Sequence, residues 1–155
     1  MLGTAILAGC GGSGASKAQS DWQSVRGPGF SFDAPAGWKV VRAKARVSAT
    51  HDAELVQVAT FPLLKPYDAT LFDKVARELQ VRMREIAGQT NGTVSGSRTV
   101  RADGVRAHAY DVKVGDHVDE YTFVLAGKRE YLLLCRRSSD GGREACDRLA
   151  ESFSR

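Results

Sequence analysis

Residues 105–137, VRAHAYDVKVGDHVDEYTFVLAGKREYLLLCRR, decide the fold of this 155-residue chain. Two turn signals, Gly115-Asp116 and Gly127-Lys128, separate three runs that are rich in β-branched and aromatic residues. Glycine at the first central position of a two-residue hairpin favours a type II′ turn, which matches the twist of the flanking strands. We therefore predict three antiparallel strands joined by tight hairpins, over residues 105–114, 118–126 and 129–137.

The hairpin turns also fix the register of these strands. They predict four cross-strand pairs: Tyr110 with Tyr121, His108 with Phe123, Phe123 with Leu132, and Tyr121 with Leu134. Because side chains alternate along a strand, the bulkier residues share one face: His108, Tyr110, Val112, Tyr121, Phe123, Leu125, Leu132 and Leu134. The other face is smaller but still apolar: Ala107, Ala109, Thr122, Val124, Tyr131, Leu133 and Cys135. Each face of the sheet must therefore be covered by another part of the chain.

A third turn signal, Asp103-Gly104, precedes this stretch and favours a type I′ turn. It predicts a further strand over 93–102 and sets Arg101 opposite Arg106. Like charges that face each other destabilise a sheet unless an anion or a carboxylate lies between them. Arg98, Arg101 and Arg106 are therefore the candidate anion contacts of the chain. The alternative is a solvated face on which these arginines point apart.

Residues 54–61 form another predicted strand, with apolar side chains on both faces, which is typical of a central strand. A helix over 70–87 follows, because apolar residues recur there at helical spacing. These residues are Phe72, Val75, Ala76, Leu79, Met83 and Ile86. Thr70 with Asp73 predicts the N-cap of this helix, and Gly88 predicts its C-terminal end. We expect the helix to cover the bulkier face of the sheet.

The N-terminal part of the domain is predicted as a hairpin. Phe30 and Phe32 alternate with polar residues and indicate a half-buried strand. Residues 34–37, Ala-Pro-Ala-Gly, form a turn, and 38–42 is the return strand. The region over 47–53 is interpreted as a loop.

A last helix is predicted over 143–153, where Cys146, Leu149, Ala150 and Phe153 share one side. A disulfide between Cys135 and Cys146 would hold this helix against the smaller face; two separate thiols are the alternative. The predicted fold class is therefore α+β, with an antiparallel sheet of about six to seven strands between a long helix and a C-terminal helix.

The N-terminus resembles a bacterial lipoprotein signal, because Leu7-Ala8-Gly9-Cys10 has the pattern of a lipobox. The resemblance implies that Cys10 is acylated and that residues 1–10 are the signal segment, although no positive charge precedes it. This suggests a true start further upstream or a clipped sequence. We predict a tether over 11–27 and one domain over 28–155. A chance cysteine in a disordered N-terminus is the alternative.

The opening of the domain, Phe30-x-Phe32-x-x-Pro35-x-Gly37-Trp38, together with the predicted layout, resembles the PsbP-like superfamily of α/β/α sandwiches. The similarity would cover about residues 29–153. It implies a role as an assembly or accessory factor rather than an enzyme, and some bacterial members are small exported lipoproteins. No ligand or metal residue of the family can be matched to a position here.

The sequence lacks the motifs of the common catalytic centres. No G-x-S-x-G elbow, phosphate-binding G-x-x-x-x-G-K-[ST] loop or H-E-x-x-H zinc helix occurs. Of the histidines His51, His108 and His117, we take the last, with Asp119 and Glu120, as the candidate local cluster, and alternation separates Asp119 from Glu120. A zinc site needs three or four converging ligands. We therefore predict no catalytic residue, no metal and no cofactor.

Composition narrows the function class further. Hydrophobic residues make up 43% and charged residues 26% of the chain, which is typical of one globular domain. A net charge of +4 favours anionic partners only weakly. Nucleic-acid binding would need aromatic residues along a basic groove, so we expect no nucleic-acid partner.

These observations predict an exported lipoprotein, anchored in the cell membrane through Cys10 and facing the extracytoplasmic side. Its expected role is that of a non-enzymatic binding or accessory module for an envelope protein or a small ligand. The alternative is a small envelope hydrolase or metal-dependent enzyme whose site assembles only in three dimensions.

Overall fold

The predicted hairpins form the C-terminal half of a seven-stranded antiparallel sheet. This computed structural model describes residues 21–155, and its four long strands are β6 (Thr93–Ala102), β7 (Val105–Val114), β8 (His117–Ala126) and β9 (Arg129–Ser138). All four predicted cross-strand pairs are present. Positive φ angles at Asp103 and Gly104, and at Gly115 and Gly127, match the three predicted turns. The predicted strands, turns and registers of this region are therefore confirmed.

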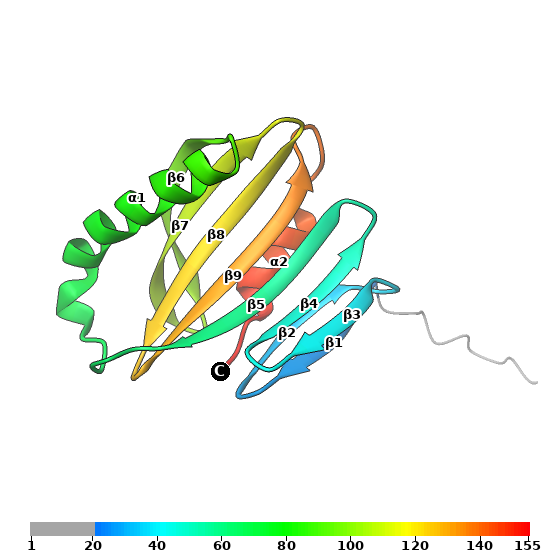
Figure 1. Cartoon of the computed structure of the whole chain (residues 1–155). Helices are drawn as coiled ribbons and strands as arrows, with labels where there is room; N and C mark the ends of the chain where they lie inside the picture. The colour runs from blue at the N-terminus through cyan, green and yellow to red at the C-terminus, as the bar shows by residue number, and fades with distance from the viewer. Residues whose placement is uncertain (1–20) are drawn as a thin grey trace, which may run out of the picture.

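The other strands of this sheet come from the N-terminal half: β3 (Lys39–Ala43), β4 (Arg46–His51) and β5 (Glu54–Pro62). The sheet order is β3-β4-β5-β9-β8-β7-β6 (Figure 1). β5 thus has neighbours on both sides, as predicted. β4 occupies most of the region predicted as a loop over 47–53. Its buried side chains are the small Val47 and Ala49, so its apolar alternation is weak in the sequence.

The predicted hairpin of the N-terminal strands is wrong. β2 (Phe30–Pro35) pairs with β1 (Trp22–Gly27) in a separate two-stranded sheet, whereas β3 pairs with β4. Between β2 and β3 the chain changes layer, and Gly37 has a φ of 83° at that point. The turn was predicted correctly, but it joins two different sheets rather than two strands of one hairpin.

β1 lies inside the segment predicted as a tether, residues 11–27. A tether would therefore end before Trp22. The strand is weakly marked in the sequence because Val25 is its only fully buried residue. The predicted signal segment, including Cys10, lies outside the described residues.

The long helix α1 (Phe72–Gln89) begins and ends two residues later than predicted. A short 3₁₀ turn, η1 (Ala69–Leu71), precedes it. The predicted cap by Thr70 is replaced by Asp68, whose Oδ1 accepts a hydrogen bond from the Thr70 amide at 2.8 Å. At the other end Gly88 remains helical, and Asn91 takes the left-handed conformation that follows the helix.

α1 covers the bulkier face of the sheet, as predicted (Figure 1). Its buried residues Leu79, Met83 and Ala87 pack in one core cluster with Tyr110, Val112, Tyr121, Phe123 and Leu132. Arg82 lies over the ring of Phe123, with its guanidinium carbon 5.1 Å from the ring centre. A single helix therefore closes this side.

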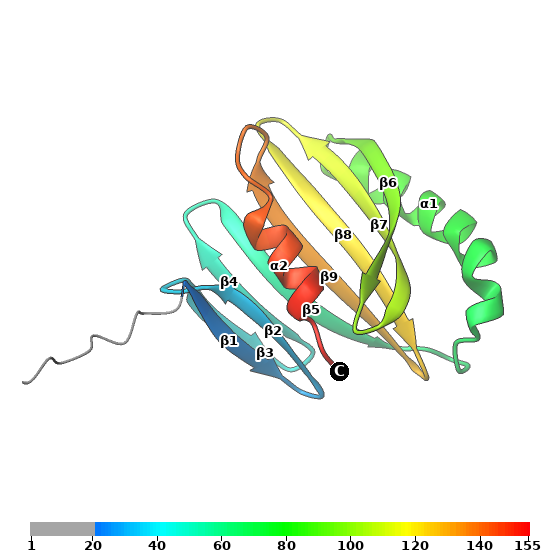
Figure 2. The same cartoon turned by 180° about the vertical axis from the view of Figure 1, so that it is seen from behind.

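The opposite face carries α2 (Glu144–Ser152) and the β1–β2 hairpin (Figure 2). The predicted disulfide is present: Cys135 in β9 is bonded to Cys146 in α2, with Cα atoms 5.4 Å apart. Leu149 and Phe153 join the larger core cluster with Phe30, Phe32 and Leu133. No helix within residues 21–155 combines the length and apolar character needed to cross a membrane.

Candidate anion-binding cleft

A cleft of about 490 Å³ opens on the α1 side of the sheet, where α1 begins. Its walls come from η1 and α1, from the β6–β7 and β8–β9 turns and from the C-terminus. We call it the basic cleft, because three arginines line it together with apolar residues. The residues that matter for its chemistry are Tyr67, Phe72, Arg101, Arg106, Leu125 and Arg155.

Two of these arginines carry charges that no carboxylate balances. Arg101 and Arg106 are cross-strand partners, as the Asp103-Gly104 turn predicted. Neither forms an ion pair with a carboxylate of residues 21–155. Arg101 donates to the Gly104 carbonyl at 3.2 Å. Arg155 differs, because its Nε lies 3.1 Å from the Asp103 carboxylate.

A stack of rings fixes the position of Arg106. Its guanidinium carbon lies 3.9 Å from the centre of the Phe72 ring, a cation–π geometry. Phe72 in turn stacks on His108, with ring centres 3.8 Å apart. His108 Nε2 also lies 2.9 Å from the Phe72 carbonyl oxygen and donates to it. The ring of His108 is therefore used to support the cleft wall, and Arg106 is preorganised there.

Tyr67 can add a neutral hydrogen-bond donor at the edge of the cleft. Burial raises the pKa of its hydroxyl, Arg106 opposes that rise, and Asp68 and Asp73 reinforce it. The net direction is upward, so the hydroxyl keeps its proton at neutral pH. Its backbone N–H donates to the Gly127 carbonyl at 2.7 Å, which holds the residue against the β8–β9 turn.

Arg98 does not belong to this cleft, and its prediction as an anion contact is corrected. It lies three residues before Arg101, so alternation along β6 directs it to the opposite face. There its guanidinium contacts Asp111 at 2.7 Å and Glu120 at 2.6 Å. Its charge is already balanced by carboxylates of the protein.

Glu120 is the centre of an ion cluster that the sequence did not reveal. Its side chain is 6% exposed and lies within 3.1 Å of three arginines: Arg98, Arg137 and Arg143. Arg143 directly precedes α2, so the cluster ties the start of that helix to the sheet. Asp119, on the other face as predicted, forms a two-point pair with Arg136 at 2.7 and 2.8 Å. These contacts are structural.

The histidines do not converge. His51 stacks on Trp38, with ring centres 6.2 Å apart, and lies 3.5 Å from Asp52. His117 lies 3.6 Å from Asp116 at another turn. Within residues 21–155 no group of three or more His, Cys, Asp or Glu side chains could hold a metal ion. The three-dimensional assembly of histidines that an enzyme was expected to need is thus not formed by these side chains.

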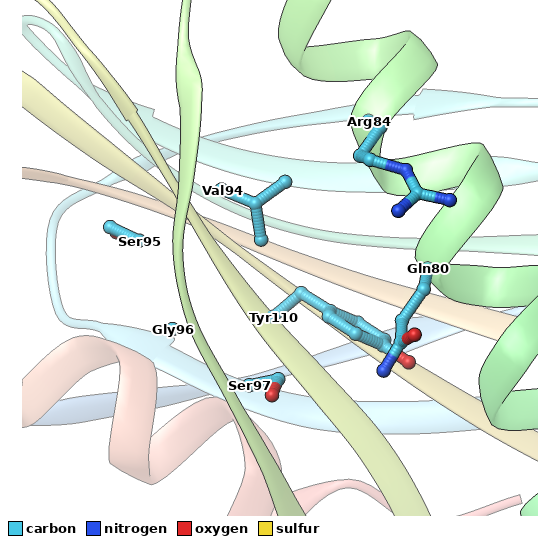
Figure 3. Close-up of a pocket in the computed structure, with 7 residues that line it drawn as sticks. All are labelled: Gln80, Arg84, Val94, Ser95, Gly96, Ser97 and Tyr110. Carbon is cyan, nitrogen blue, oxygen red and sulfur yellow. The ribbon is translucent and has the colours of Figure 1, made fainter.

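A second cleft, of about 360 Å³, lies between α1 and the edge strand β6. Figure 3 shows Gln80 extending from α1 toward Tyr110, Arg84 on the same helix, and Val94 and Ser95 on opposite sides of the strand. The Tyr110 hydroxyl already donates to the Ala76 carbonyl at 3.2 Å. This cleft has a single cationic side chain, Arg84, whereas three arginines line the basic cleft, so the basic cleft is the better candidate for binding an anion.

No protein-family model matches the sequence, and no curated protein matches it either. Among solved structures, the solution structure of cyanobacterial PsbP (CyanoP) from Synechocystis sp. PCC 6803 matches with a TM-score of 0.64 and 18% identity. The match covers 96% of this chain and 98% of that protein. A crystal structure from Bacteroides thetaiotaomicron VPI-5482 matches with a TM-score of 0.51 and 9% identity, over 87% of this chain and 48% of the other.

The chain therefore has the α+β fold of PsbP-like proteins, as the opening motif and the predicted layout indicated. At these levels of identity the likeness concerns the fold alone. Any role has to be argued from the residues of this chain.

Proposed function

We propose that this protein is a lipid-anchored, non-enzymatic accessory module of the bacterial cell envelope that binds an anionic group in the basic cleft. The PsbP-like resemblance implies an accessory rather than a catalytic role. The Leu7-Ala8-Gly9-Cys10 pattern supports the anchor and the extracytoplasmic location. The partner is an envelope protein or a small ligand that presents the anionic group.

The observation that carries the binding role is the pairing of Arg101 with Arg106. Adjacent like charges on a sheet cost stability, and this pair is held in a cleft rather than spread over an open surface. Two other arginines of the sheet, Arg98 and Arg136, are by contrast balanced by carboxylates. A bound anion would supply the missing charge, with charge-assisted hydrogen bonds from both guanidinium groups.

The position of the cleft also suits an anchored module. Trp22, where the fold begins, lies with Glu54 and Gly142 at the end of β9 that leads to α2. The basic cleft lies at the other end of this 10-residue strand, about 30 Å away. A tether over residues 11–21 has a reach of about 18 Å. An anchor at Cys10 would thus leave the basic cleft free to face a partner.

Two measurements test the proposal. Mass spectrometry of the native protein should find a diacylglyceryl group on a fragment that begins at Cys10; an unmodified residue there would overturn the anchor. For binding, inorganic phosphate should shift the amide resonances around Arg101 and Arg106 at low ionic strength. Arg101→Gln/Arg106→Gln should weaken that binding at least about tenfold, the loss expected for a charge-assisted pair.

A matched control is Arg42→Gln/Arg46→Gln, which removes two exposed charges from the β3–β4 hairpin at the sheet edge. This variant should keep the phosphate affinity of the parent. Equal losses in both double variants would show a response to net charge only and would contradict a site at the basic cleft.

A further inference from the structure

An apolar groove adjoins the basic cleft. The groove, about 330 Å³ in volume, runs between α1 and the segment Leu63–Tyr67, and it shares Tyr67 and Leu125 with the basic cleft. The side chains of Leu63, Leu71, Val75, Leu79 and Leu125 line it. A path of apolar surface therefore leads away from the two arginines.

One charged pair that lines the groove is already neutralised, whereas Lys65 and Glu78 line it without an ion pair among residues 21–155. At its far wall Arg82 Nη1 lies 2.8 Å from Glu130 Oε1, and the Glu130 side chain is 11% exposed. Because this buried carboxylate has its own cation, it neither repels an anion in the basic cleft nor attracts a second cation. Apart from Lys65 and Glu78, what the groove offers to a ligand is apolar contact.

The apolar wall remains accessible to solvent. Of the lining residues Leu71 is 42% exposed, whereas Leu79 and Leu125 are buried and form the floor of the groove. The segment itself is fixed, since Leu63 N–H and Tyr67 N–H donate to the carbonyls of Lys128 and Gly127 at 2.9 and 2.7 Å. Exposed apolar surface next to an unbalanced charge pair matches a molecule that has both features.

We infer that the basic cleft and the apolar groove together bind a single-chain amphiphilic anion. Its head group lies between Arg101 and Arg106 with the Tyr67 hydroxyl as a further donor, and its chain lies along Leu71 and Val75. The inference rests on the proposed anion site, and it adds an apolar chain to the anionic group that this site binds. A phosphate or a carboxylate head satisfies the same arginines.

The test is a chain-length series. Inorganic phosphate and hexyl, octyl and decyl phosphate, each below its micelle concentration, are titrated calorimetrically into the full chain carrying Cys10→Ser. Each buried methylene should raise the affinity about threefold to fourfold until the groove is filled. Octanol, which lacks the charge, should bind at least about tenfold more weakly than octyl phosphate.

Amino-acid substitutions distinguish the binding of the ligand's head group from the binding of its alkyl chain. Leu71→Gln should flatten the dependence on chain length and leave the affinity for inorganic phosphate unchanged. Val81→Gln, at an equally exposed aliphatic residue of α1 outside both clefts, should change neither. Arg101→Gln/Arg106→Gln should lower the affinity for every phosphate in the series.

The outcomes distinguish the two proposals. Equal affinity for all chain lengths would leave the anion site standing and overturn the amphiphile. No binding of any phosphate would overturn both. Arginine-dependent binding to phosphatidylglycerol vesicles, without binding of monomeric alkyl phosphates, would also overturn the inference, because the ligand would then be a bilayer surface.

Discussion

The two faces of the sheet are closed in different ways. On the α2 side the helix is cross-linked by the Cys135–Cys146 disulfide, by the Glu120 ion cluster and by an ion pair between Arg148 and Asp33 of β2. On the α1 side one helix packs on the sheet, and three clefts border that helix or the segment before it. The contrast suggests that the α2 side maintains the fold and the α1 side is available for recognition.

The largest effect is expected at the Glu120 cluster. Glu120→Ala would leave Arg137 without a carboxylate and would leave Arg98 and Arg143 only Asp111 and Asp147; breaking a buried pair costs several kcal/mol. Because these arginines are 14–39% exposed and can turn to water, we expect about 3 kcal/mol of lost unfolding free energy, measured by urea titration. Glu151→Ala, at an exposed residue of α2, is the control and should change it little. A loss of unfolding free energy below about 1 kcal/mol would show that the Glu120 cluster does not hold α2 to the sheet.

The disulfide should contribute slightly less. Cys135 and Cys146 are separated by 11 positions, and closing so short a loop stabilises a domain by about 2–3 kcal/mol in the chain-entropy model. We expect Cys135→Ala/Cys146→Ala to lose that amount in urea titrations under oxidising conditions. The parent under reducing conditions should approach the same value. Equal stability of parent and variant would show that α2 is held by packing and ion pairs alone.

The α1 side should determine the alkaline limit of stability. Burial raises the pKa of Tyr110 and of Tyr121, and Asp119 adds to the rise at Tyr121. Groups with a raised folded pKa stabilise fully below their unfolded pKa of 10.0, and that contribution is lost as pH rises through the folded pKa. Tyr110→Phe/Tyr121→Phe should therefore show a shallower fall of unfolding free energy above pH 10.0 than the parent. If the unfolding free energy of the parent and of the variant fell in parallel above pH 10.0, these two tyrosines would not limit stability in alkali.

The smallest effect is expected from the arginine pair of the basic cleft. Without an anion, Arg101→Gln/Arg106→Gln removes a like-charge contact and also the cation–π contact of Arg106 with Phe72, so the unfolding free energy should stay within about 1 kcal/mol of the parent. Added phosphate should stabilise the parent but not the variant. A variant that is more than about 1 kcal/mol less stable than the parent in the absence of any anion would mean that these arginines serve the fold.

The features that could be predicted depend on local signals. Turn chemistry at Asp103-Gly104, Gly115-Asp116 and Gly127-Lys128 fixed three registers, and alternation then gave both faces and the cysteine pair. β1 and β4 were missed because Val25, Val47 and Ala49 are almost the only apolar residues buried in them. No local signal in the sequence of β2 indicates that it pairs with β1, which precedes it in the chain, rather than with β3.

The candidate site follows the same rule. Arg101 and Arg106 were brought together by a turn that the sequence shows plainly. Tyr67, Phe72 and Arg155 reach the cleft from distant parts of the chain, so only the tertiary fold places them there. The sequence excludes Arg98 from the cleft, because residues three positions apart on a strand, such as Arg98 and Arg101, point to opposite faces.

The pairing of β5 with β9 has a consequence for how the chain is made. These two central strands are separated in sequence by α1 and three strands. During synthesis β5 emerges long before its partner, and its edge stays open until the whole hairpin series is complete. Contacts of such long sequence separation form slowly and leave strand edges open to misassembly. A nascent chain of this protein therefore exposes one unpaired edge of β5 until β9 is made and the middle of the sheet closes.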